Sequence, residues 1–447
     1  MNNKRSNYFL VMTVFLTAAI NLSGQIPVIA PPKPASPFTI PDYNNPTPQV
    51  KPINPNPIAP NPGNPMEMVE RDMRELKQRN AELYKMLHEY EDFMANRSTP
   101  YDLPSLLGIP GTEYYQNALD ELSKMLRGEV PLNLKDAVFT VENAYFENRL
   151  DYSKFNKAIN ELSEIARLKT MQDKYNWNHP LTKNIMLFRV MADTLEIKSP
   201  QRETSIVSYP MQYDFEDSFG EEDWASMFVS KLLATRFGQC HSLPLLYLIL
   251  CEETGAEACL AYSPMHSYIK IKDDSGDWHN LELTNGTIAS EAYVIGSGYI
   301  TSEAVKHGTY LQAQRKEQVI AQCVSDLAMG YIQKYGYDSF VKQCTDSVFK
   351  YDANNLAGLM IDANYATQRF AYAIYRAGLP PLDSLKTHYP KIHELLDDRN
   401  AAYTRLDAIG YCEFPKEEYK AWLNAFNEEK ARREHNEKYN KMLRLMR

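Results

Sequence analysis

The sequence lacks several features that would assign it to a common functional class. Its formal net charge of −9 argues against bulk binding to nucleic acid or to acidic membranes, which requires a basic surface. No cluster of cysteine and histidine has the spacing of zinc ligands, and no glycine-rich stretch resembles a phosphate-binding loop. We therefore expect no metal, no cofactor and no nucleic-acid partner.

Cysteine is also scarce, with six residues in 447. These cysteines are widely scattered, unlike the dense framework of a small disulfide-rich protein, and a chain of this length builds a core without covalent cross-links. We expect most of them to be buried free thiols, with Cys323 and Cys344 the first pair to check for a disulfide.

The N-terminus has the pattern of an export signal. Lys4 and Arg5 precede an apolar stretch at residues 8–20 that is short for a membrane span. We expect residues 1–24 to be a signal peptide and the protein to be periplasmic or secreted, with no membrane contact beyond this segment. An uncleaved anchor is the alternative.

Two further segments precede the globular part. Residues 25–65 are rich in proline and asparagine, and proline removes the donors that helices and sheets need, so we expect an extended linker. A proline-rich ligand for a partner domain is the alternative. Residues 66–97 carry apolar residues spaced by three and four, with Asn80 at an a position of the heptads. This helix either self-associates as a coiled coil or lies on the globular domain.

The most informative stretch delivers Cys240 to the start of an apolar segment, residues 243–251. This segment predicts a buried helix that ends at Gly255. Proline is tolerated only in the first turn, so Pro244 indicates that the regular helix begins near Ser242. A thiol at the start of a helix faces unpaired N–H groups and the positive end of the helix dipole, which favour the thiolate.

Two runs of alternating polarity follow, at residues 263–272 and 278–284, around a polar turn at 273–277. They predict an antiparallel hairpin. A turn centred in the middle of 273–277 places His266 opposite Glu282 or its immediate neighbours. A carboxylate in that position fixes the tautomer and the orientation of an imidazole that acts as a general base.

A cysteine alone is most often an inert core residue, but here a histidine and an acid follow it. We interpret Cys240 as the nucleophile of a triad, His266 as its base and Glu282 as the acid that orients the base. The backbone N–H of Cys240 and the side chain of Gln239 are the candidate oxyanion donors. Tyr268 either shapes the cleft or packs within the hairpin.

At these residues the sequence resembles the transglutaminase-like cysteine-enzyme superfamily. The Gly-Gln-Cys at 238–240 matches that of animal transglutaminases, and the longer run at 238–247 is similar to the Gly-Asn-Cys-x-Ser-Leu-x-x-Leu-Tyr of bacterial members. The resemblance covers roughly residues 222–290. It implies the same triad, with glutamate in the place usually held by aspartate. It also implies an α+β fold with a papain/transglutaminase-like core, in which the cysteine helix packs on antiparallel strands, and hydrolysis of a peptide or amide bond.

Amphipathic patterns predict helices on the N-terminal side of this core. We expect them at residues 114–126, 134–148, 152–175 and 181–195. The polar stretch at 199–222 is interpreted as a surface loop that lines or gates the cleft.

The C-terminal part, residues 311–447, is also predicted to be helical, with helix-turn-helix units that loosely match tetratricopeptide repeats. Fewer than three units do not make a self-supporting solenoid, so we describe this part as tetratricopeptide-like. Residues 98–310 would then form the transglutaminase-like domain together with its N-terminal helices.

These patterns favour an exported thiol hydrolase that acts on a peptide or protein substrate through an acyl-enzyme. Peptide, cell-wall amide and protein glutamine all remain open as substrates. The alternative is a non-catalytic binding or scaffold protein that uses the coiled coil and the C-terminal helices. The enzyme requires His266 within reach of both Cys240 and an acid at an open cleft, whereas the scaffold predicts a sealed cysteine or an acid turned away.

Overall fold

The computed structural model describes residues 101–198, 205–291, 294 and 299–412. The predicted signal peptide, the proline-rich linker and the helix at 66–97 all lie outside the described residues, as does the end of the predicted helical part, residues 413–447. None of the helices within the described ranges has the length and hydropathy of a membrane span.

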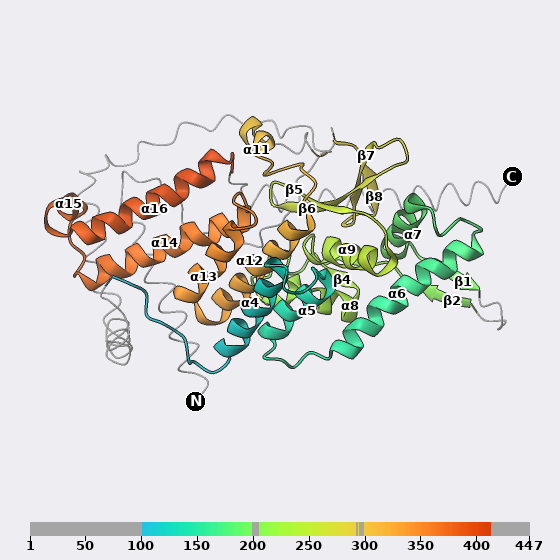
Figure 1. The fold of residues 1–447 in the computed structure, drawn as a ribbon, viewed down its shortest axis with the longest axis horizontal. Helices are drawn as coiled ribbons and strands as arrows, with labels where there is room; N and C mark the ends of the chain where they lie inside the picture. The colour runs from blue at the N-terminus through green and yellow to red at the C-terminus, as the bar shows by residue number, and fades with distance from the viewer. Residues whose placement is uncertain (1–100, 199–204, 292–293, 295–298, 413–447) are drawn as a thin grey trace, which may run out of the picture.

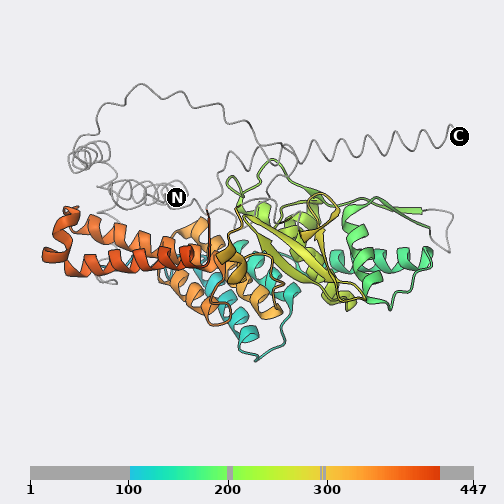
Figure 2. The same cartoon turned by 90° about the horizontal axis from the view of Figure 1, so that it is seen from above.

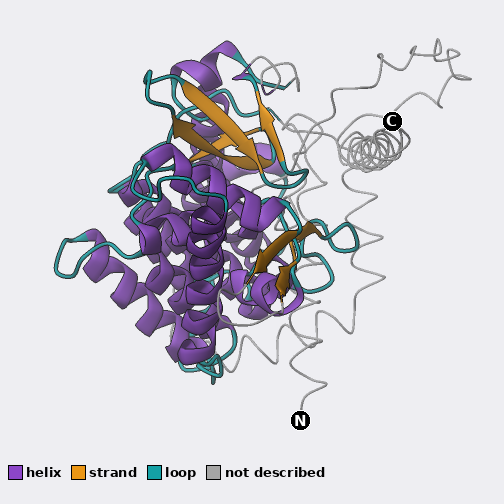
Figure 3. Cartoon of the chain, turned by 90° about the vertical axis from the view of Figure 1, so that its right-hand side faces the viewer, coloured by secondary structure: helices purple, strands orange, loops and turns teal. Residues whose placement is uncertain are grey.

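The fold is α+β, with one four-stranded sheet lying on a larger helical body (Figure 1; Figure 3). The helices are α4 Thr112–Leu126, α5 Leu134–Tyr145, α6 Tyr152–Gln172, α7 Pro180–Ala192, α8 Val229–Thr235, α9 Ser242–Thr254, α11 Ser302–Lys306, α12 Lys316–Tyr335, α13 Ser339–Phe349, α14 Leu356–Arg376, α15 Leu385–His388 and α16 Pro390–Ala408. The strands are β1 Leu195–Lys198, β2 Ser205–Ser208, β3 Gln212–Tyr213, β4 Phe237–Gly238, β5 Cys259–Ser263, β6 His266–Lys272, β7 Trp278–Glu282 and β8 Thr287–Ala289.

The sheet contains the predicted hairpin. Its strand order is β5-β6-β7-β8, and all neighbouring strands are antiparallel. In the hairpin of β6 and β7, Ile269 pairs with Leu281 and Lys270 with Asn280. Continued toward the start of β6, this register brings His266 next to the end of β7, as the position of the turn predicted.

Helix α9 matches the prediction from its apolar sequence. It begins at Ser242, holds Pro244 in its first turn and ends at Gly255, whose φ of 65° closes the helix. Every residue from Ser242 to Cys251 is buried. A helix that is apolar on all sides needs cover on all sides. It receives this cover from the sheet and from helices α5, α6, α7 and α8.

One hydrophobic cluster spans the domain boundary that was predicted at residue 310. It includes residues of α4 to α9, the inner face of the sheet, α12 and α13. Helix α12 packs directly on α4 and α5, and Tyr115 of α4 makes an edge-on ring contact with Tyr331 of α12. The N-terminal helices, the sheet and α12 therefore share a core.

The stretch expected to be a surface loop, residues 199–222, is structured in its described part. Residues Ser205–Ser208 form β2, which pairs antiparallel with β1, and Gln212–Tyr213 forms β3, which pairs parallel with β4. Phe219 is buried. The expected helix at 181–195 correspondingly ends at Ala192, because Leu195 begins β1. Backbone pairing with the neighbouring β1 and with the later β4, rather than local polarity, decides the structure here.

The C-terminal helices extend away from the sheet (Figure 1; Figure 2). Neighbours along the chain pack on one another, α12 on α13 and α13 on α14, and α16 then packs along α14. Two small clusters of buried apolar residues hold α14 and α16 together. All six cysteines are free, including Cys323 in α12 and Cys344 in α13, both of which are buried.

Candidate active site

Cys240 lies in the short connection between β4 and α9. The connection is tight, because a side chain at Gly238 would place its Cβ 2.7 Å from Ser242 Oγ. The same Oγ accepts a hydrogen bond of 2.9 Å from the backbone N–H of Gln239 and so ties the connection to the first turn of α9. Glycine and serine at these two positions fix the place where Cys240 enters the helix.

Cys240 is completely buried in this structure. Burial raises the pKa of its thiol well above the ordinary value, and the nearby charge of Glu282 raises it further. The backbone N–H groups of Ser267 and of Cys240 itself lower the pKa, but by less. The N–H groups favour the thiolate, as expected at the start of a helix, but in this conformation the desolvation of the buried thiol outweighs them.

His266 and Glu282 form the pair expected from the hairpin. His266 Nε2 and Glu282 Oε2 are 2.6 Å apart, and both side chains are buried. The other carboxylate oxygen, Oε1, accepts hydrogen bonds from the backbone N–H and the Oγ1 of Thr284, at 3.2 and 2.6 Å. The carboxylate is held on both oxygens, and it in turn fixes the imidazole.

The second ring nitrogen of His266 is left open. Nδ1 is buried and has no hydrogen-bond partner. Since Nε2 faces a carboxylate, the hydrogen-bond network assigns the proton of a neutral ring to Nε2, and Nδ1 keeps its lone pair. A lone pair on a ring oriented by an acid is the arrangement that a general base needs.

Ser267 connects the cysteine to the histidine strand. Its Oγ donates a hydrogen bond of 2.5 Å to the carbonyl oxygen of Cys240. Its backbone N–H also lowers the pKa of the Cys240 thiol by hydrogen bonding to the sulfur. Because Ser267 directly follows His266, these contacts hold the start of α9 against the start of β6. The sequence analysis did not single out Ser267.

The side chain of Gln239 is not available as an oxyanion donor. Its Nε2 donates to the backbone carbonyls of Asp214 and Asp217, both at 3.0 Å, and so uses both of its hydrogens. Gln239 Oε1, which is buried without a partner, is an acceptor and cannot stabilise an anion. The role predicted for this side chain is therefore wrong. Instead, Gln239 holds the segment at 214–223 against the connection that carries Cys240.

Tyr268 lies beside the histidine. Its ring stacks on that of His266, with centroids 6.2 Å apart and an interplanar angle of 24°. The hydroxyl is buried without a partner, and burial raises the pKa of Tyr268. The ring packs with Ala261, Tyr310 and Leu311 in a separate apolar cluster. Tyr268 therefore positions the imidazole and is packed in the sheet at the same time.

A second group of buried polar residues includes His241, which directly follows Cys240 in the chain. His241 Nε2 is 3.2 Å from Asp326 Oδ2 of α12, and Gln322 Nε2 donates to the other oxygen of Asp326 at 2.9 Å.

Glu142 of α5 is fully buried and accepts hydrogen bonds from the backbone N–H groups of Val229 and Ser230 at the start of α8. Burial raises the pKa of Glu142 to about 7.

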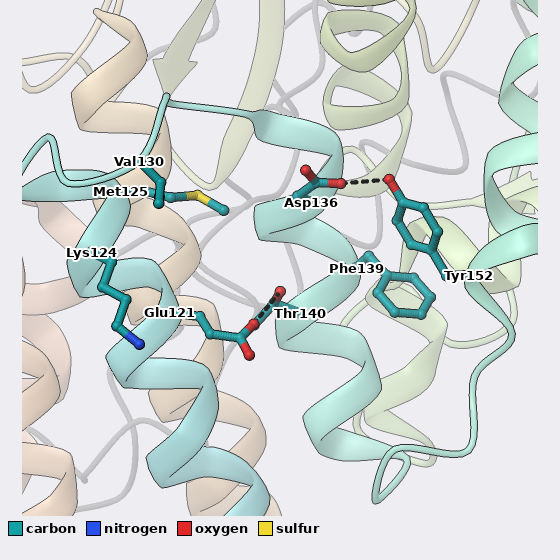
Figure 4. A pocket seen from close by; sticks show the side chains of 8 residues that line it. All are labelled: Glu121, Lys124, Met125, Val130, Asp136, Phe139, Thr140 and Tyr152. Carbon is teal, nitrogen blue, oxygen red and sulfur yellow. Dashed lines mark hydrogen bonds between the residues drawn. The ribbon is translucent and has the colours of Figure 1, made fainter.

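A surface pocket between α4, α5 and α6 contains none of these residues (Figure 4). It has a volume of about 340 Å³. Four of its polar side chains pair with one another, since Tyr152 donates to Asp136 and Thr140 to Glu121, and Lys124 pairs with Asp120 outside the lining. Its lining consists of Glu121, Lys124, Met125, Val130, Asp136, Phe139, Thr140 and Tyr152.

Among the described residues, no group of three or more histidines, cysteines and carboxylates is placed to hold a metal ion. The residues of the candidate site supply a thiol, an imidazole with one open nitrogen and a carboxylate held in place. No protein-family model, curated protein or solved structure matches this chain.

Proposed function

We propose that this protein is a transglutaminase-like cysteine hydrolase that cleaves a peptide or amide bond through Cys240, His266 and Glu282. The observation that carries the proposal is the 2.6 Å contact between His266 Nε2 and Glu282 Oε2, which leaves Nδ1 of the same ring unpartnered. The proposed core, a cysteine helix on antiparallel strands, is of the papain/transglutaminase type.

The reaction would follow from these positions. Nδ1 of His266 removes the proton of the Cys240 thiol, and the sulfur attacks the carbonyl carbon of the substrate. The negative charge of Glu282 stabilises the imidazolium that forms. The imidazolium then protonates the leaving amine as the C–N bond breaks, and a water molecule, deprotonated by the same ring, hydrolyses the thioester. The backbone N–H of Cys240 serves as an oxyanion donor.

The described conformation is a closed one, since Cys240 is fully buried. Substrate access therefore needs a movement next to Cys240. The segment at 214–223 is the proposed gate, because Gln239, the residue before Cys240, holds it through two hydrogen bonds. The segment also has an internal anchor, since the carboxylate of Asp217 accepts from the backbone N–H groups of residues 221–223. An anchored segment of this kind can move as a unit.

The proposal includes the expected export of the protein and, through residues 66–97, its self-association. Export would bring the enzyme to extracellular or periplasmic peptides and to cell-wall amides.

The test is hydrolysis with matched variants. The full chain is incubated with an unfolded protein and with a cell-wall peptide, and new amino termini and released ammonia are measured. The account predicts new termini with the native chain and none with Cys240→Ala or His266→Ala. Equal activity of the three chains would exclude this triad as the source. Ammonia without new termini would indicate that the substrate is a glutamine side chain.

A binding or scaffold function is the second candidate, and one observation favours it. A cysteine that is completely buried, with a pKa raised by that burial, is what a retained but inactive core predicts. The two functions differ in what Cys240→Ala does in the cell of origin. A scaffold keeps its cellular role in this variant, whereas the enzyme loses it.

A further inference from the structure

The surface pocket between α4, α5 and α6 has an apolar wall (Figure 4). The rings of Phe139 and Tyr152 meet edge to face, with centroids 5.0 Å apart, and Met125 and Val130 add aliphatic surface. Val130 and Tyr152 are each 41% exposed, so this wall is accessible from the solvent. The volume of about 340 Å³ lies within the usual range of ligand pockets, roughly 300–1,000 Å³. The pocket therefore has room for apolar side chains of a ligand.

Two carboxylates of the same lining have no basic partner. Glu121 and Asp136 each accept one hydrogen bond from a hydroxyl group of the lining, at 3.3 and 2.6 Å. Lys124, the basic residue of the lining, is paired with Asp120 of its own helix at 2.6 Å. Among the described residues, no basic side chain forms an ion pair with Glu121 or Asp136. A hydroxyl group does not neutralise a carboxylate, so the pocket keeps two uncompensated negative charges.

These features together define the chemistry of a ligand. The exposed apolar surface favours aliphatic side chains, and the two carboxylates favour basic ones. The aromatic rings also attract a cation that lies over them. Lysine and arginine combine both properties, because an apolar stem carries the charged group. The pocket therefore suits a peptide segment in which basic and aliphatic side chains alternate.

The chain itself contains a segment of this composition. Residues 438–447 hold four basic residues and no acidic one, with four aliphatic side chains between them. No other ten consecutive residues outside the described ranges combine four basic side chains with no acidic one. The basic residues are Lys438, Lys441, Arg444 and Arg447, and the aliphatic ones are Met442, Leu443, Leu445 and Met446. The charge and the apolar content of this segment both complement the pocket.

The segment is within reach of the pocket. The described chain ends at Cys412, beside α11, where Thr301 Oγ1 donates to the carbonyl of Gly410 at 2.9 Å. The 25 residues from 413 to 437 separate this point from the segment. An extended chain of that length spans roughly 85 Å, whereas a compact body of about 300 residues has a radius of gyration of about 20 Å. The connection therefore does not restrict which face the segment contacts.

We propose that this pocket is the docking site for residues 438–447 of the same chain. The aliphatic side chains of the segment lie against Val130, Phe139 and Tyr152, and its basic side chains pair with Glu121 and Asp136. The contact brings the C-terminal part of the chain onto the N-terminal helices. The proposal does not depend on the triad, so it holds for an enzyme and for a scaffold.

The test uses full-length chains and a fluorescein-labelled peptide with the sequence of residues 438–447. In one chain, which we call the tail variant, Leu443→Ser and Leu445→Ser remove apolar contacts of the chain's own segment. In the native chain the attached segment competes with the peptide at an effective concentration on the order of 1 mM. Fluorescence anisotropy should therefore show that the peptide binds the tail variant at least roughly tenfold more tightly than the native chain.

Further changes within the tail variant locate the binding site. Glu121→Gln and Asp136→Asn each remove one carboxylate, and each should weaken peptide binding roughly twofold to fivefold, the effect of one exposed ion pair. Glu222→Gln, in the acidic stretch at 214–223, is the matched control and should leave the affinity unchanged. A peptide that carries both serines should bind the tail variant at least roughly tenfold more weakly than the native peptide. This last comparison uses a single protein, so it does not depend on how the pocket variants fold.

Three kinds of result would overturn the proposal. Equal affinity of the native chain and the tail variant for the peptide would show that the segment does not occupy the pocket in its own chain. Equal losses in Glu222→Gln and the two pocket variants, or equal binding of the two peptides, would show general attraction to an acidic surface. Native dimers that the tail variant does not form, measured by light scattering, would show that the segment binds a second copy instead. None of these results involves Cys240, so the proposed function is tested separately.

Discussion

Ser267 holds Cys240 by two contacts at once. Its Oγ donates to the Cys240 carbonyl at 2.5 Å, and its backbone N–H lowers the pKa of the Cys240 thiol. One contact fixes the backbone at the start of α9 and the other acts on the sulfur. Because the neighbouring residue is His266, this serine sets the position of the nucleophile relative to the base.

Replacing Ser267 with alanine should therefore destabilise the protein. The change leaves a buried carbonyl without its partner, which costs about 1–3 kcal/mol. Urea denaturation of the native chain and the variant measures the difference. Ser275→Ala, at the exposed turn of the same hairpin, is the matched control. A loss in Ser267→Ala no larger than in Ser275→Ala would mean that this hydrogen bond does not hold the site together.

Labelling of Cys240 with iodoacetamide should be slow at neutral pH. Only the thiolate reacts, and burial raises the pKa of Cys240 well above 9.0, so its thiolate fraction is below that of an ordinary thiol. The rate should keep rising with pH beyond about 9, whereas an ordinary thiol levels off near its pKa of about 8.5. Mass spectrometry of the alkylated chain gives the rate at each cysteine, and half-buried Cys412 is the internal control. Fast labelling of Cys240 at pH 6 would contradict the closed, neutral thiol.

Replacing Gln239 with leucine should open the site. Leucine keeps the volume but removes both hydrogen bonds to the carbonyls of Asp214 and Asp217. The gate at 214–223 should then open more often, and Cys240 should be labelled roughly tenfold faster. Gln172→Leu is the matched control, because Gln172 also bonds two backbone groups, those of Glu196 and Lys198, away from the site. Equal labelling rates in the native chain and Gln239→Leu would show that this segment is not the gate.

The stability of the protein should fall between about pH 4.5 and pH 7 because of Glu142. Burial raises its pKa from 4.5 to about 7, so over this range the folded state binds more protons than the unfolded state. The contribution is fully present below pH 4.5 and is lost as the pH rises through the folded pKa, up to about 3 kcal/mol. Urea denaturation at pH 5 and pH 8 should show a smaller decrease for Glu142→Gln than for the native chain. The same pH dependence in both chains would contradict this assignment.

The elements around the site follow from local signals in the sequence. Pro244 and Gly255 set the two ends of α9, and the turn at 273–277 sets the register that brings His266 to Glu282. Each of these signals depends on residues close together in the chain, so it can be read from one sequence without knowing the fold.

The burial of the site residues and their hydrogen-bond partners do not follow from such local signals. Cys240 is buried by packing that involves the whole core, and Gln239 is bound by backbone carbonyls of residues 214 and 217, which no pattern of side chains indicates. Glu142 lies in an amphipathic helix, where a glutamate is expected at the surface, yet it caps the start of α8 from inside the core. These relationships join segments that are far apart in the sequence.

The most direct test of the triad is the rate at which p-nitrophenyl acetate acylates Cys240, measured by p-nitrophenolate release and by mass spectrometry of the cysteine. The account predicts an acetyl group on Cys240 in the native chain and a rate roughly 10²–10⁴ times lower in His266→Ala. Glu282→Gln should also be slower, because a neutral amide does not stabilise the imidazolium. His279→Ala should react at the native rate, since His279 forms a similar pair with Asp273, at 2.7 Å, near the turn of the hairpin. Acetylation of Cys240 at one common rate in the native chain, His266→Ala and His279→Ala would contradict the account.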